Sequence, residues 1–311
     1  MAGWIKDFWL QFDKYIQLEK SYRSTFFVIP FKNRPGSRIS PSQAKRRATK
    51  YDAEDVRDAI RILAMAGKEV ALHGIDAWHD PMAGIEEKRR IEAFTGKAIN
   101  GVRMHWLCFS RESPFLLDQE GFGYDSTIGY NETIGFKAGT LQVFRPVGCR
   151  KLLELPLHVQ DVAMFFPGFK DWKPKIARRQ CLEIFNMAEK YGGVVTLLWH
   201  ERSLGPERGW GAFYEMLLRE LERRKASIAS ASEIVSWFRS RRQIRFLNIQ
   251  PVENGVRVEL ERPDAEPFVQ FIVRYYQEDG ESFTDTTFCD EPKVFIPLST
   301  SPKAGEDVSA I

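Results

Sequence analysis

The 311 residues suffice for one large domain of about 200 to 250 residues and a second, smaller one, and a hydrophobic content of 43% excludes a disordered or fibrous chain. The 45 basic and 42 acidic side chains give a net charge of +3, which offers no basis for a nucleic-acid partner. No run of about 18 apolar residues is present and the first residues do not form a leader, so we expect no membrane span and a cytoplasmic location. The 4 cysteines are far apart in the sequence and are expected to be reduced.

Helix and strand patterns alternate along most of the chain. Apolar residues recur at helical spacing within residues 4–16, and the segment 24–30 (STFFVIP) is apolar on both faces, as in a strand buried on both sides. A basic loop without periodicity follows at 31–50. The remaining pattern predicts, in chain order, a helix from 52 to a glycine stop at 67, a strand at 69–73, a helix at 85–95, a short strand from 102, a short helix at 114–120, a strand at 153–159, a helix at 176–191, a strand at 194–200 and helices at 210–224 and 232–241.

This alternation predicts a parallel sheet with right-handed crossovers, either closed as a barrel or open as a doubly wound sheet. No glycine-rich phosphate loop follows a strand, which disfavours a dinucleotide fold. After Arg242 the pattern changes to short strands at 244–249, 256–260, 268–276 and 293–298. We therefore predict an α/β domain at 1–242 and a small antiparallel β domain at 243–311, which serves as a carbohydrate-binding or interface module or as a structural lid.

The 5 histidines lie at or near predicted strand ends. His73 and His200 each close a strand, His105 and His158 lie near the ends of two others, and His79 lies in the loop after the second strand. In parallel barrels the catalytic groups sit at the carboxyl ends of the strands. A single histidine is more often structural, but several at one edge of the sheet indicate a metal or acid–base site.

An ordered set of motifs between Ser24 and Arg241 resembles the polysaccharide deacetylases, the NodB-homology carbohydrate esterases. The motifs are STFF at 24–27, His-Gly at 73–74, EEKRR at 86–90, GVRMH at 101–105, YDST at 124–127, GFKAGT at 135–140, ELP at 154–156 and LLWH at 197–200. The resemblance implies a distorted, incomplete β/α barrel. It also implies metal-assisted removal of an N- or O-acetyl group from a carbohydrate, such as a cell-envelope polysaccharide.

The resemblance assigns roles to individual residues. His73 matches the first ligand of a divalent metal such as zinc, which lowers the pKa of bound water to about 7. His200 matches the general acid that protonates the departing amine. Arg103 matches the arginine that orients the catalytic aspartate, and Asp125 either supports the site or caps a turn.

The second metal ligand departs from the family pattern. The family places a histidine four positions after the first one, where this chain has Ala77. His79, His105 or Asp76 can supply the missing ligand, and the sequence does not choose among them. We therefore include His73, His79 and His105 in the predicted metal site.

The aspartate pair that the family carries on its first strand has no counterpart in the sequence. Asp7 and Asp13, the only early aspartates, lie on the predicted first helix. We expect either that the true start lies upstream or that this is a degenerate member with weak or no activity, because the loss of a general base costs about 10² to 10⁴ in rate.

Two other functions remain open. Trp106, Trp199 and Tyr124 are candidates for stacking on a sugar ring, so the chain can instead be an inactive pseudo-enzyme that binds carbohydrate. A glycoside hydrolase with two carboxylates is the other alternative, because acidic residues lie near predicted strand ends. They are Glu154, Asp161 and Glu201. This alternative does not explain the histidines.

Overall fold

A computed structural model describes residues 11–37, 47–261, 271–276, 283–288 and 293–297. The chain forms two compact units, one up to Ser232 and the other from Glu233 on. The division falls inside the helix α9 (Ala231–Gln243). The boundary predicted after Arg242 lies at the end of this same helix and stays a prediction. In the described part of the chain, no helix is both long and apolar enough to cross a membrane.

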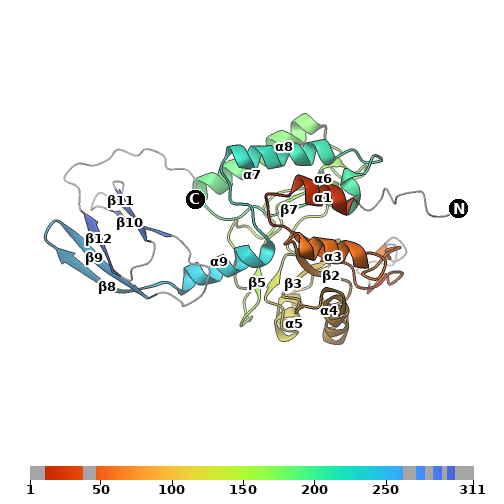
Figure 1. Ribbon diagram of the computed structural model, residues 1–311, viewed down its shortest axis with the longest axis horizontal. Helices are drawn as coiled ribbons and strands as arrows, with labels where there is room; N and C mark the ends of the chain where they lie inside the picture. Colours follow the sequence, from red (N-terminus) through yellow and green to blue (C-terminus); the bar gives the residue numbers. More distant parts are fainter. Residues whose placement is uncertain (1–10, 38–46, 262–270, 277–282, 289–292, 298–311) are drawn as a thin grey trace. The chain divides into compact units, whose positions relative to one another are not determined.

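A parallel sheet forms the centre of the first unit (Figure 1). Its five strands are paired in sequence order, which is the arrangement that successive right-handed crossovers give. A separate parallel pair consists of β6 (Val159–Gln160) and β7 (Leu197–Leu198). The strands of the larger sheet are β1 (Thr25–Val28), β2 (Glu69–Gly74), β3 (Gly101–Met104), β4 (Tyr124–Asp125) and β5 (Leu153–Glu154). The predicted α/β fold with a parallel sheet is confirmed, and the division into five and two strands fits an incomplete barrel.

Helices surround these strands, with α3 and α4 outside β2 and β3, and α7 and α8 beside β7 (Figure 1). Two 3₁₀ turns, η2 (His105–Leu107) and η3 (Glu201–Leu204), follow β3 and β7 directly. The helices are α1 (Phe12–Leu18), α3 (Arg57–Met65), α4 (Pro81–Thr95), α5 (Ser113–Gln119), α6 (Asp161–Phe165), α7 (Pro174–Tyr191) and α8 (Gly211–Arg223).

The described core of the first unit consists of two larger hydrophobic clusters and a smaller one, in which Tyr15 on α1 packs with Tyr214 on α8. One larger cluster lies between β1, β2 and β3 and the helices α3 and α4, where Ile60, Leu72 and Val102 are at most 1% exposed. The other larger cluster joins β6 to α6, α7 and α8. The clusters leave the carboxyl ends of β2, β3 and β7 free to carry polar side chains.

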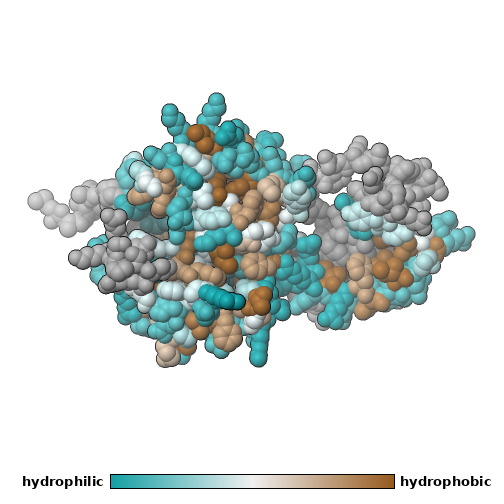
Figure 2. All heavy atoms as spheres, turned by 180° about the vertical axis from the view of Figure 1, so that it is seen from behind, coloured by the Kyte–Doolittle hydropathy of each residue, from teal (hydrophilic) through white to brown (hydrophobic). Residues whose placement is uncertain are grey.

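The second unit is β-rich, as predicted. Its three-stranded antiparallel sheet has the order β12-β9-β8, and β10 (Phe271–Tyr276) pairs with β11 (Phe283–Phe288). The larger sheet consists of β8 (Arg245–Val252), β9 (Gly255–Glu261) and β12 (Lys293–Pro297). Three hydrophobic side chains on β8 are more than half exposed: Phe246, Leu247 and Ile249. Figure 2 shows brown, hydrophobic surface on this unit among teal, hydrophilic surface. The first part of the predicted strand at 268–276 lies outside the described residues.

Candidate functional site

Three of the predicted histidines lie together at the carboxyl ends of the strands. His73 on β2 is in register with Arg103 on β3, and His105 follows β3 directly. His73 Nε2 lies 3.0 Å from His105 Nδ1, and the two rings meet edge to face. His200 follows β7, and its charge contributes to lowering the pKa of both of the other rings, so it lies close to them.

In His73 and His105, one ring nitrogen faces the other ring and the second, the outer nitrogen, faces a backbone carbonyl group. The partners of the outer nitrogens show which nitrogens carry a hydrogen. His73 Nδ1 lies 3.0 Å from the carbonyl oxygen of Arg103, and His105 Nε2 lies 2.8 Å from that of Arg47. A carbonyl oxygen only accepts hydrogen bonds, so both of these nitrogens carry a hydrogen. In neutral rings the two facing nitrogens then each hold a lone pair. Two lone pairs 3.0 Å apart repel each other unless a proton or a metal ion bridges them.

The surroundings disfavour a bridging proton at neutral pH. Burial, and then the charge of His105, hold the pKa of His73 well below its usual range. Burial also lowers the pKa of His105 to about 4, with a further contribution from the guanidinium of Arg47. A divalent cation matches two facing imidazole lone pairs. The donor set of the pair therefore fits a metal.

His79, the third predicted ligand, has a different partner in the structure. Its Nε2 lies 3.2 Å from Asp76 Oδ1, and its ring packs against Trp78. Asp76 Oδ1 in turn accepts a hydrogen bond from the backbone N–H of Ser37. Among the described residues, no group of three or more His, Cys, Asp or Glu side chains is placed to hold a metal. Two of the three predicted ligands are thus brought together.

His200 forms an ion pair with a carboxylate that the sequence analysis did not assign to it. Its Nδ1 lies 2.7 Å from Asp161 Oδ1, and Asp161 Oδ2 accepts the backbone N–H of His200 and the hydroxyl of Ser203. Burial works to lower the pKa of His200, but the charge and hydrogen bond of Asp161 outweigh it and the pKa is raised. Nε2 of His200 has no hydrogen-bond partner in the described part of the chain, and the side chain is 38% exposed. This ring can therefore donate a proton outward.

The strand pairing explains why Asp161 meets His200. β6 and β7 are parallel, with Gln160 opposite Leu198, so the residues that follow these strands leave the same edge of the sheet. Asp161 and His200 are the first polar side chains there. Because the sequence pattern predicts one continuous strand at 153–159, it does not place Asp161 at the start of a new element.

A second buried cluster of charges lies behind His73. Asp125 and Glu154 are opposite each other on β4 and β5 and are both 0% exposed. Arg103, predicted to orient an aspartate, donates through Nε to Ser126 O at 2.9 Å and through a terminal nitrogen to Ser126 Oγ at 2.7 Å. Its guanidinium also lies over the ring of Phe27. Asp125 is buried and accepts the hydroxyl of Thr127, and both of its predicted roles, support of the site and turn cap, stay predictions.

The glycoside hydrolase alternative does not fit these positions. Its carboxylates must flank a glycosidic bond, but Glu154 and Asp161 are 0% exposed. Asp161 is also committed to His200. The third carboxylate, Glu201, hydrogen-bonds to Tyr51.

The predicted sugar-binding aromatic residues have three different environments. Tyr124 is 0% exposed and its hydroxyl donates to Glu69, so it belongs to the core and does not contact a ligand in this conformation. Trp199 is half-buried and stacks on Phe213 and Tyr214. Trp106 follows His105 with a φ of 62°, a left-handed backbone conformation that is uncommon for an aromatic residue and that occurs often at functional sites. Sugar contacts by Trp106 and Trp199 stay predictions.

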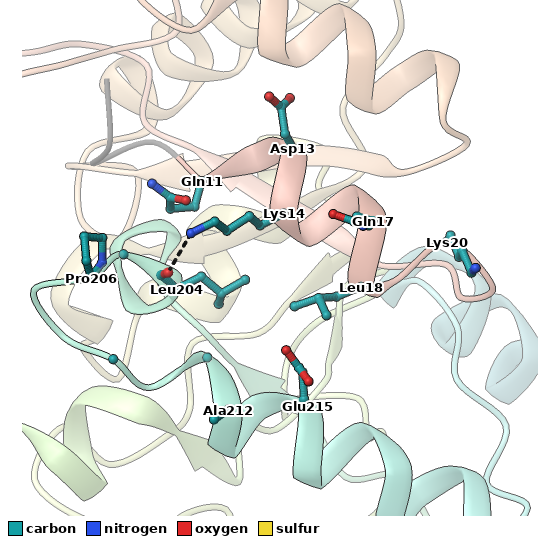
Figure 3. Close-up of a pocket in the computed structure, with 13 residues that line it drawn as sticks. Gln11, Asp13, Lys14, Gln17, Leu18, Lys20, Leu204, Pro206, Ala212 and Glu215 are labelled. Carbon is teal, nitrogen blue, oxygen red and sulfur yellow. Dashed lines mark hydrogen bonds between the residues drawn. The ribbon is translucent and has the colours of Figure 1, made fainter. Parts of the chain in front are cut away.

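A hollow of about 980 Å³ lies elsewhere, between α1 and the segment that joins η3 to α8 (Figure 3). Lys14 reaches across from α1 to the carbonyl oxygen of Leu204. The lining carries side chains of both signs, including Asp13, Lys20 and Glu215, and none of the histidines. We therefore place the candidate site at the histidines and not in this hollow.

Comparisons with known proteins agree with this fold. No family model and no curated protein match the sequence. A protein assigned as a polysaccharide deacetylase from Mycobacterium smegmatis has a similar structure, with a TM-score of 0.55 and 21% identity over 78% of this chain and 82% of that one. Another, from Pseudomonas aeruginosa PAO1, has a TM-score of 0.50 and 17% identity over 74% of this chain and 73% of that one. At these identities the likeness shows the fold, which is the one that polysaccharide deacetylases adopt.

Proposed function

We propose that this chain is a hydrolase of the polysaccharide deacetylase type, which removes an N- or O-acetyl group from a carbohydrate. The observation that carries the proposal is the His200–Asp161 pair after β7, which lies near the facing rings of His73 and His105 at the carboxyl ends of β2 and β3. Hydrolysis of an amide needs a proton donor for the departing nitrogen. His200 meets this need because Asp161 keeps its Nδ1 hydrogen-bonded and leaves Nε2 open.

His73 and His105 would hold a divalent metal such as zinc. When bound, such an ion activates water at neutral pH and polarises the acetyl carbonyl group. The chain's own contribution is to keep both outer nitrogens protonated, through the carbonyl groups of Arg103 and Arg47, so that both inner nitrogens can bind a cation. Two nitrogens are an incomplete set, and the other ligands would come from substrate, water or residues outside the described part.

The histidine pair is tested by metal titration of purified protein. We expect His73→Gln and His105→Gln each to weaken zinc binding by more than about 100-fold, since even indirect partners of metal ligands are worth about 10- to 100-fold. His79→Gln is the matched control, because His79 is paired with Asp76. Calorimetry measures the affinity. An equal loss in His79→Gln would restore the predicted three-histidine site, and no zinc binding by the parent chain would contradict the metal proposal.

A second candidate is a carbohydrate-binding domain without catalysis. It is favoured by the absence, within the described residues, of a third metal-binding side chain beside His73 and His105. The two functions differ in one measurement. Acetylated chitooligosaccharides incubated with the zinc-loaded chain release acetate if it is a hydrolase, and His200→Gln abolishes the release. Saturable binding of the sugar without acetate release would support the second candidate instead.

A further inference from the structure

Within the described residues, the buried acids Asp125 and Glu154 each have one side-chain oxygen without a hydrogen-bond partner. Asp125 Oδ1 accepts the hydroxyl of Thr127, and Glu154 Oε1 accepts the backbone N–H of Ile128 at 2.9 Å. Asp125 Oδ2 and Glu154 Oε2 are buried and accept no hydrogen bond from the described part of the chain. Because the two residues are paired on neighbouring parallel strands, their side chains leave the sheet on the same side.

Asp125 and Glu154 form an electrically neutral set with their neighbouring cation if the two acids together keep one proton. Arg103 on β3 is 4% exposed and is the cation whose charge lowers the pKa of both acids. Two other titratable groups interact with this guanidinium: Tyr124 on β4, whose hydroxyl donates to Glu69, and His73 on β2, whose pKa the guanidinium helps to lower. Two carboxylates and one guanidinium would leave a net negative charge in a dry interior, which is costly. With one proton retained, the set is neutral, and burial agrees by raising the pKa of Asp125 to about 7 and that of Glu154 well above its usual range.

We propose that Asp125 and Glu154 share a single proton between Oδ2 and Oε2, and that this pair fixes the tautomer of His73 through Thr127 and the Arg103–Met104 peptide. A shared proton gives Asp125 Oδ2 and Glu154 Oε2 each a hydrogen-bond partner. Asp125 and Glu154 are then positioning residues, since neither touches the histidines.

A continuous chain of hydrogen bonds connects the acid pair to His73. The hydroxyl of Thr127 donates to Asp125 and accepts the backbone N–H of Met104 at 3.0 Å. The carbonyl group of the same peptide, that of Arg103, accepts Nδ1–H of His73 at 3.0 Å. Hydrogen bonds in such a chain polarise one another. The negative charge of the pair thus favours the tautomer of His73 whose Nε2 lone pair faces His105.

Infrared difference spectra of the full chain test the shared proton. Glu154→Gln and Asp125→Asn each replace one acid by an amide that donates to the remaining carboxylate. We expect each variant to lose the same carboxylic-acid C=O band at neutral pH, and the double variant to lose no more. Glu120→Gln controls for a different buried acid. No loss in either variant would show that both acids are ionised, and a doubled loss in the double variant would show that each holds its own proton; both results overturn the proposal.

Thr127 tests the connection to His73. In Thr127→Val, the Arg103 carbonyl group still favours Nδ1–H but is less polarised, so nitrogen NMR of the metal-free protein should show a minor Nε2–H form of His73 beside the Nδ1–H form. Thr127→Ser should restore the single Nδ1–H form. Thr196→Val is the matched control, since the buried hydroxyl of Thr196 has no partner in the described part of the chain. A single His73 tautomer in a folded Thr127→Val protein would overturn the connection. We also expect Thr127→Val to weaken zinc binding by about 10- to 100-fold. This expectation alone rests on the proposed function. The spectra of the metal-free protein do not depend on it, so the two proposals can fail separately.

Discussion

The three clustered histidines differ in protonation because one nitrogen of each ring is hydrogen-bonded to the protein, and the kind of oxygen that it meets differs. His73 and His105 donate to neutral carbonyl groups, which do not offset the cost of a buried positive charge. Nδ1 of His200 lies against the carboxylate of Asp161, whose negative charge offsets this cost. One residue type therefore supplies two lone-pair donors and one proton donor within the same site, and the neighbouring oxygen decides which.

Asp161→Asn should reverse the pKa shift of His200. Without the carboxylate, burial dominates, and we expect the pKa of His200 to fall below its ordinary value of about 6.5. In the parent chain the raised pKa contributes stability that is present below the unfolded value and is lost as the pH rises through the folded value. The destabilisation by Asp161→Asn should thus be larger at pH 5.5 than at pH 9, as urea unfolding can measure. Asp171→Asn, on the exposed surface, is the control.

NMR titration gives the decisive measurement for this pair. An unchanged pKa of His200 in Asp161→Asn would show that the charge of Glu201, which also raises this pKa, keeps it raised without Asp161.

At this scale the sequence predicts the histidines but not their partners. His73, His105 and His200 lie at or just after the ends of apolar strand segments, so their place at the carboxyl ends of strands can be inferred from pattern alone. Asp161 could not be paired with His200 because only the register of β6 and β7 brings them together. Tyr124 was expected to contact a sugar, yet its ring fills the space above Gly101, where an added Cβ would lie 1.9 Å from the ring.

Short elements carry the site, and side chains from helices hold them in place. Glu87 on α4 accepts the backbone N–H groups of Ile75 and Asp76, both at 2.8 Å, and thereby fixes the loop after β2. On the other side, Tyr15 on α1 donates to the carbonyl oxygen of His200 at 2.7 Å. The strand ends at His73 and His200 are thus each fixed by a helix that contributes no reacting group.

Tyr15 offers a test of this support. Tyr15→Phe removes only the hydrogen bond to His200, and we expect a loss of about 0.5–1.5 kcal/mol in the free energy of unfolding. Tyr15→Ala also removes a 3% exposed ring that packs on Phe26 and Tyr214, and should cost about 3–5 kcal/mol. Urea unfolding measures both. Tyr191→Phe, at a 65% exposed position, should be neutral, and equal losses in Tyr15→Phe and Tyr15→Ala would contradict the packing role of α1.

The differences between predicted and observed elements have local causes. The helix predicted from Ile85 begins at Pro81, because Asp80 caps it by accepting the N–H groups of Met82 and Ala83. The predicted strand at 153–159 divides into β5 and β6 around Pro156, which has no N–H for the ladder. β4 has two residues, which is too short for any periodicity to reveal.

For the whole molecule, the sequence predicts the fold class more readily than it predicts which charged side chains pair with each other. The alternation of apolar strands and amphipathic helices predicts the parallel sheet, and the change after Arg242 predicts the β-rich unit. The full burial of Glu87, Glu120, Asp125 and Glu154 is not visible in such patterns. In the structure all four are at most 8% exposed, and burial raises the pKa of each.

These raised pKa values predict the pH dependence of the first unit. A carboxyl group that binds its proton more tightly when folded contributes stability that is fully present below its unfolded pKa of about 4 and is lost as the pH rises through its folded pKa. The folded pKa is about 7 for Glu87 and Asp125 and about 8 for Glu120. Below pH 6.5 the lowered pKa values of His73, His105 and His158 act in the opposite direction. The free energy of unfolding should therefore fall between about pH 6.5 and pH 8.

Glu120 is the acid on which this prediction is best tested. Burial first, and then the charge of Glu87, raise its pKa, and neither of its side-chain oxygens has a hydrogen-bond partner in the described part of the chain. Glu120→Gln keeps the shape of the neutral acid but cannot ionise. We expect the variant to match the parent at pH 5.5 and to be about 1–3 kcal/mol more stable at pH 9, because the parent then buries an unpaired charge. Exposed Glu132→Gln should change stability equally at both pH values, and a Glu120→Gln protein that is less stable than the parent at pH 9 would mean that the carboxylate of Glu120 is paired in solution.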